Sequence, residues 1–139
     1  MPTLTRWFVK SALVFFVAAL FIGLAQSAGS FWGGAPLLSA LGPVYFHLFM
    51  VGWITQLIFG VVFWMFPKYS PERPRGSERL GWGVFFLINA GLVLRAIGEP
   101  LNSLSPGTIW GWLLVVSAIL QWLAGLGFVA NTWARVKER

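Results

Sequence analysis

Four long apolar runs, separated by short polar or turn-rich segments, account for most of the chain: residues 8–28, 44–66, 80–98 and 109–133. At about 1.5 Å of rise per residue, helices over these runs can cross about 30 Å of hydrocarbon. Residues that predict helix breaks fall between the runs, at Gly33 to Pro36, Gly42-Pro43, Pro71, Pro74, Pro100 and Pro106. The pattern predicts an all-α integral membrane four-helix bundle, up-down-up-down, with residues 1–139 forming a single domain.

Composition narrows the classes of function. The chain has 139 residues, of which 58% are hydrophobic and 10% charged, so no aqueous domain is expected. Its net charge of +6 does not point to nucleic acid, because the cations flank the apolar runs. One histidine, no cysteine, no aspartate and four glutamates cannot build a three-ligand zinc or copper site within one chain. A hydrolytic triad is absent for the same reason.

Basic residues predict the orientation, because Lys and Arg gather in cytoplasmic loops. All but Arg95 would lie on one side, namely Arg6, Lys10, Lys68, Arg73, Arg75, Arg79, Arg135, Lys137 and Arg139. Both termini are therefore expected to be cytoplasmic, in a multi-pass protein of the cell (inner) membrane. Tryptophans would mark the inner interface at Trp7, Trp64, Trp82 and Trp133, and the outer one at Trp32, Trp110 and Trp112.

The first run ends in Ala25-Gln26-Ser27-Ala28, which is similar to a secretory cleavage site. Its apolar stretch exceeds the usual core of a signal peptide. We therefore expect a retained helix.

Small residues predict which helix faces pack together, since they permit close backbone approach in lipid. The fourth run repeats them every seven residues, and the first run does the same; the positions are Gly111, Ala118, Gly125 and Thr132, and Ser11, Ala18 and Ala25. These two seams predict an antiparallel pair of the first and fourth helices. Gly52 and Gly60 frame Gln56, which is expected to hydrogen-bond across a helix interface. At about 100° per residue, His47 would face away from Gln56.

His47 is the only histidine and lies within the second apolar run. An ionisable side chain at that depth indicates function, and a neutral imidazole is a good axial ligand for haem iron. Met50 and Val51 continue its stripe as an apolar surface for a macrocycle. The alternative is an interfacial histidine that is hydrogen-bonded to a neighbour or to water.

Arg95 and Glu99 end the third run on the same side as His47. Gly91, Arg95 and Gly98 fall on one face, and they predict a groove beside a guanidinium that would bind a haem propionate. The alternative is that Arg95 and Glu99, four residues apart, pair with each other, or that Arg95 reaches lipid headgroups.

The stretch Tyr45 to Lys68, YFHLFMVGWITQLIFGVVFWMFPK, resembles the second helix of haem-copper oxidase subunit I proteins, including nitric oxide reductase relatives. It is also similar to the histidine-bearing helix of the NnrS family of haem membrane proteins. The likeness covers Val44 to Gly98 and rests on a His-x4-Gly, Phe-Gly, Met-x-Pro pattern. It implies that His47 is an axial ligand of a b-type haem.

The oxidases carry further histidines for a second axial bond, for copper and for a catalytic haem, and this chain has none of them. No complete oxidase or reductase site is therefore expected in this chain alone. The expected function is binding of haem b by one histidine per chain, for electron transfer or for capture of a diatomic gas. A homo-oligomer and a respiratory-chain partner are expected as well. The alternatives are a cofactor-free accessory subunit of a respiratory complex and, more weakly, a small transporter.

Overall fold

The computed structural model describes residues 1–31, 33–72 and 74–136, and within them every regular element is helical. The helices are α1 (Thr3–Phe31), α2 (Pro36–Ala40), α3 (Gly42–His47), the π-helix η1 (Leu48–Thr55), α4 (Gln56–Met65), α5 (Glu78–Leu104), α6 (Thr108–Thr132) and the 3₁₀ turn η2 (Trp133–Arg135). Four predicted positions, Trp32, Arg73, Lys137 and Arg139, lie outside the described residues.

Four helical segments among the described residues are long and apolar enough to cross a membrane: Thr3–Phe31, Pro36–Met65, Glu78–Leu104 and Thr108–Arg135. We call Pro36–Met65, which joins α2, α3, η1 and α4, the second span. Three segments contain their predicted runs and extend them at both ends, and the second covers its run except for Phe66 and extends it at the start. The prediction of four membrane-length helices is therefore confirmed.

Two of the predicted helix breaks, Gly42-Pro43 and Pro100, lie within helical segments, so their predicted positions are wrong. The second span begins at Pro36 instead of Val44, and Gly42-Pro43 leaves only a one-residue turn at Leu41. Pro43 stands in the first turn of α3, where a missing backbone N–H costs nothing. Pro100 lies inside α5, which continues to Leu104. Pro100 removes one backbone hydrogen bond to the preceding turn, and it is buried within the bundle.

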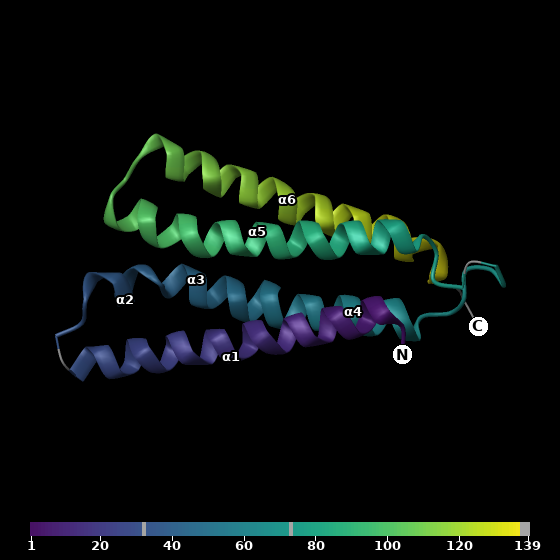
Figure 1. Ribbon diagram of the computed structural model, residues 1–139, viewed down its shortest axis with the longest axis horizontal. Coiled ribbons are helices and arrows are strands. Elements are labelled where there is room, and N and C mark those ends of the chain that lie inside the picture. Colours follow the sequence, from purple (N-terminus) through teal and green to yellow (C-terminus); the bar gives the residue numbers. More distant parts are fainter. Residues whose placement is uncertain (32, 73, 137–139) are drawn as a thin grey trace.

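The helices are arranged in the order α1, second span, α5 and α6, as Figure 1 shows. α1 packs along the second span, and α5 packs along α6. Within the described residues α1 and α6 make no contact, so the predicted pairing of the first and fourth helices is wrong. Added side-chain atoms at Gly111 and Gly125 would meet nothing within 4 Å, so these two positions of the seam pack against no other helix.

One end of the molecule holds the start of α1, the end of α4, the start of α5 and the end of α6; we call it the basic end (Figure 1). Its core is aromatic. The rings of Phe59 and Phe128 stack 3.8 Å apart with an angle of 6° between planes, and Phe8 meets Phe85 edge-on at 5.2 Å. These contacts join α4 to α6 and α1 to α5, so all four long helices converge here.

Arg135 closes the basic end and is 1% exposed. Its guanidinium donates to the backbone carbonyls of Phe63, Phe66 and Pro67 at 3.1, 2.9 and 3.0 Å. Phe63 lies in the last turn of α4, Phe66 is its C-cap and Pro67 follows, in the region where a helix leaves acceptors without intrahelical partners. Arg135, which follows α6, therefore caps the second span. The sequence analysis used this residue only to predict the orientation of the helices.

A polar cluster joins three helices near their middle. Asn89 of α5 accepts a bond from the Ser11 hydroxyl of α1 at 2.7 Å and donates to Gln56 of α4 at 3.1 Å. Gln56 is fully buried. The prediction that Gln56 bonds across a helix interface is confirmed. Its flanking glycines accept large α1 side chains, Gly52 that of Phe15 and Gly60 that of Phe8, as close-approach positions should.

Candidate functional site

The candidate site lies at the opposite end, which we call the histidine end: the end of α1, α2 and α3, the end of α5 and the start of α6. His47 is the last residue of α3. Its Nδ1 atom lies 2.9 Å from the carbonyl oxygen of Pro43, one turn earlier, and 3.3 Å from Oε1 of Glu99 on α5. The ring therefore links the second span to α5.

These two neighbours decide the tautomer of His47. A backbone carbonyl can only accept a hydrogen bond, so the Nδ1 atom facing Pro43 must carry the proton. An ionised Glu99 can also only accept, so its position beside Nδ1 favours the same protonated Nδ1. In the neutral ring the lone pair then belongs to Nε2, which is the atom free to bind a Lewis acid.

Glu99 is shared between two partners. Its Oε1 atom accepts from Nη1 of Arg95 at 3.0 Å and lies within ion-pair distance, 3.3 Å, of Nδ1 of His47. The side chains of Glu99, Arg95 and His47 are 9%, 19% and 26% exposed, so the carboxylate is the most deeply placed of the three. Oε2 of Glu99 and Nε of Arg95 are buried and have no partner among the described residues. The predicted alternative that Arg95 pairs with Glu99 is confirmed.

The π-helix η1 explains why one angular prediction is wrong. At α-helical pitch, nine residues place His47 half a turn from Gln56. Within η1 the hydrogen bonds span five residues, so each residue turns less and the phase of the helix shifts. The Thr55 hydroxyl donates to the Met50 carbonyl five residues back at 2.9 Å, which supports this geometry. Both His47 and Gln56 consequently bond to α5, through Glu99 and Asn89.

The remaining predicted residues do not all gather at His47. Met50 is 40% exposed and Val51 packs against the core of the second span. Gly91 does not line an open groove, because the Ser117 hydroxyl of α6 donates to its carbonyl at 2.6 Å. Gly98 is likewise covered by Leu113 and Leu114. The glycine groove predicted on α5 is therefore occupied by α6, and Arg95 reaches the site through Glu99 instead.

The sequence analysis missed one contact of the site, that between Glu99 and His47. It placed Glu99 on the same side as His47 but gave it only Arg95 as a partner. The phase shift in η1 turns the imidazole toward α5, and no residue type in that stretch signals a π-helix. Exposed Phe46 also lies edge-on to His47, with 6.1 Å between ring centroids.

Comparisons with protein-family models, with curated proteins and with solved structures found no match for this chain. The site must therefore be interpreted from its own chemistry. Among the described residues, no group of three His, Asp or Glu side chains lies close enough to hold a bare metal ion. A macrocycle supplies four nitrogen donors itself and needs only an axial donor from the protein, so a single imidazole with a free Nε2 fits haem better than it fits a bare ion.

Proposed function

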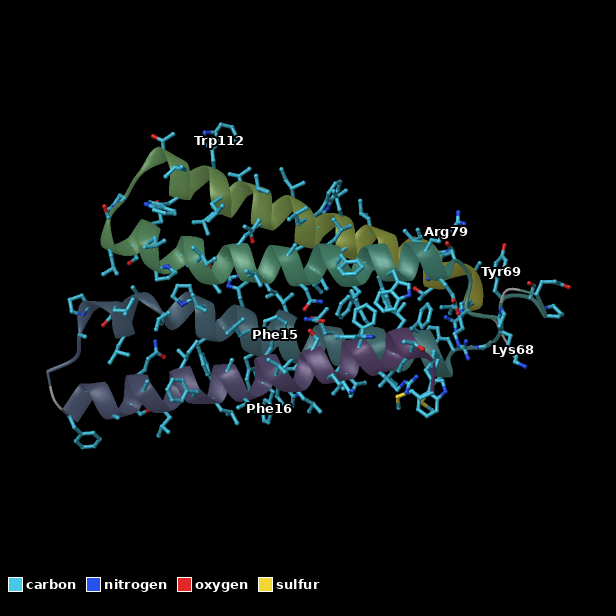
Figure 2. All side chains as sticks on the ribbon, in the orientation of Figure 1. Phe15, Phe16, Lys68, Tyr69, Arg79 and Trp112 are labelled. Atoms are coloured by element: carbon cyan, nitrogen blue, oxygen red, sulfur yellow. The ribbon has the colours of Figure 1, made fainter. Side chains whose placement is uncertain are left out.

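We propose that this chain is a multi-pass protein of the cell inner membrane that crosses it up-down-up-down, with both termini in the cytoplasm. The support is the distribution of charge. Lys68 and Arg79 lie at the basic end in Figure 2, and Arg6, Arg75 and Arg135 belong to the same end. Because Lys and Arg gather on the cytoplasmic side, the histidine end then faces outward.

We further propose that the chain binds a b-type haem through Nε2 of His47. The observation that carries this proposal is the setting of Nδ1, which donates to the carbonyl of Pro43 and lies 3.3 Å from the carboxylate of Glu99. Metal-ligating histidines commonly donate their second ring N–H to a carbonyl or a carboxylate, which fixes the tautomer and aims the other nitrogen. A bound haem would supply a one-electron couple or an iron centre that takes a diatomic gas.

The residues around His47 suit an apolar ring with charged substituents. Phe46 and Met50 are exposed on either side of His47 in the chain and give the ring an apolar surface. Arg95 has a buried Nε without a described partner, which is a donor for an anionic substituent. Because the imidazole is itself partly exposed, a second copy of the chain or a respiratory-chain partner would complete the enclosure.

Absorption spectroscopy tests the proposal. The protein is purified in detergent from cells supplied with haem precursors, and a Soret band is expected. The band should be lost in His47→Gly and regained on adding imidazole, because free imidazole can occupy the space of the missing ring. Phe16→Ala, which also removes a whole aromatic ring but lies on α1, serves as the control and should keep the band. A colourless wild-type protein from haem-replete cells overturns the proposal.

A cofactor-free accessory subunit of a respiratory complex is the second candidate. One observation favours it: His47, Glu99 and Arg95 bond to one another and need no ligand to do so. α6 also leaves large apolar side chains uncovered, and Trp112 projects away from the other helices in Figure 2. A colourless preparation that co-purifies with an intact respiratory complex would support this second function.

A further inference from the structure

We infer that Glu99 is the positioning residue of the site, which fixes the His47 ring and sets its strength as a donor to iron. This inference rests on the proposed function, since it assigns a role toward the proposed haem. It rests on the contact between Glu99 and His47, which bridges two helices.

The geometry singles out Glu99 over Pro43. The Pro43 carbonyl lies on the same helix as His47, one turn away, so it moves with the ring. Glu99 belongs to α5 and its side chain is 91% buried. It is therefore the contact that ties the ring to a second, independent helix. Nδ1 thus has a hydrogen-bond acceptor on its own helix and a carboxylate of α5 at 3.3 Å, and the two together restrict rotation of the ring about its Cβ–Cγ bond.

The charge of Glu99 gives the contact an electronic effect. A carboxylate that accepts the Nδ1 proton increases the basicity of the opposite nitrogen. The effect is larger away from water, because the surrounding dielectric is low. A more basic imidazole stabilises ferric haem relative to ferrous haem and so lowers the midpoint potential.

Arg95 opposes this effect. Its Nη1 atom lies 3.0 Å from the same oxygen that His47 approaches, so the guanidinium withdraws charge from the carboxylate. The two residues are thus expected to tune the imidazole in opposite directions.

Two measurements test the inference, and the first needs no haem. Because the chain has a single histidine, its Nδ1 proton gives one assignable resonance in ¹⁵N-labelled protein. The resonance should lie far downfield in wild-type apo protein and move upfield in Glu99→Gln, where a neutral amide of the same shape replaces the carboxylate. Glu78→Gln at the exposed start of α5 is the matched control and should leave the resonance unchanged.

The second measurement uses the haem-loaded protein. Glu99→Gln should weaken haem affinity about tenfold, the lower part of the range for loss of a partner behind a metal ligand. It should also raise the midpoint potential, whereas Arg95→Gln should lower it. If Glu99→Gln destabilises the fold by leaving Arg95 unpaired, the double variant Arg95→Gln/Glu99→Gln removes both charges and permits the same resonance measurement.

The two proposals fail separately. An unchanged His47 resonance in both Glu99→Gln and the double variant overturns the role of Glu99, whether or not haem binds. Shifts of the potential with the same sign in Glu99→Gln and Arg95→Gln also overturn it. If the wild-type protein takes up no haem but the resonance shifts as expected, the haem proposal falls and the contact between Glu99 and His47 stands.

Discussion

The two ends of the molecule are built differently. At the basic end four helices meet over stacked phenylalanine rings, and a buried arginine satisfies the last carbonyls of α4. At the histidine end α1 and α6 lie apart on the outer sides of the molecule (Figure 1). There a chain of three polar side chains, His47, Glu99 and Arg95, lies between the second span and α5. Two buried polar atoms of that chain have no described partner, and the same holds for Thr5 Oγ1 and Arg135 Nη1 at the basic end.

This difference separates stability from function. The basic end buries apolar rings and gives the Arg135 guanidinium three carbonyl acceptors, which are features that hold a fold in one state. The histidine end carries charged groups in an apolar setting, which is costly for stability and typical of functional sites. The four helices are thus anchored to one another at the basic end, and the proposed ligand site lies at the opposite, histidine end.

Removal of Arg135 should cause the largest loss of stability, because it removes the cap at the basic end. Arg135→Ala removes the guanidinium and leaves the carbonyls of Phe63, Phe66 and Pro67 without their donor. We expect a loss of about 3 kcal/mol in the free energy of unfolding, since bonds to charged groups are each worth about 1.5–3 kcal/mol and water replaces part of them. Unfolding by SDS in mixed micelles measures it. Exposed Arg79→Ala is the control, and an equal loss there would contradict the cap.

The central polar cluster should have the next largest effect. Asn89→Leu leaves the fully buried amide of Gln56 without its partner and should cost about 2 kcal/mol, because an unsatisfied buried polar group loses its solvation. The double variant Gln56→Leu/Asn89→Leu should recover part of this loss, since both partners become apolar. The same unfolding titration measures both. If the double variant loses as much stability as the single variants Gln56→Leu and Asn89→Leu lose together, the two amides act independently.

Glycine substitutions sharpen the comparison at a smaller scale. In Gly91→Ala the added carbon would lie 2.8 Å from Cγ of Gln121 and 3.0 Å from the Ser117 backbone oxygen, so α5 and α6 must separate. We expect a loss of about 1–2 kcal/mol from overpacking. Gly125→Ala meets nothing within 4 Å and should be neutral or more stable by up to about 1 kcal/mol, because alanine favours helix. Thermal unfolding of the two variants in one detergent compares them, and equal values would mean that Gly91 does not face α6.

The pattern of apolar and small residues predicted the number of long helices and one contact between them. Four membrane-length helices follow from uninterrupted hydrophobic runs, and the bond made by Gln56 follows from an amide framed by glycines. The helix pairing did not follow, because small residues occur on outward faces as well as on packed ones: Gly91 and Gly125 have the same side chain, and only Gly91 is covered. Pairing depends on which hairpins form, which a periodicity within one helix does not encode.

The candidate site was predictable in its residues but not in its connections. His47, Arg95 and Glu99 were placed on one side because an ionisable residue near a helix end is unusual among apolar runs. Their contact depends on the phase of the second span, which η1 alters between His47 and Gln56. That shift arises from backbone hydrogen bonding over eight residues, and apolar side chains there carry no signal of it.

The Arg135 cap also has a consequence for biogenesis. Arg135 is 68 residues beyond Pro67, whose carbonyl it binds, so the ribosome completes the second span long before the arginine exists. Until then the end of that span must be hydrated at the membrane surface. Closure of the cap therefore follows synthesis of the fourth helix, and it ties retention of the second span to the arrival of that helix.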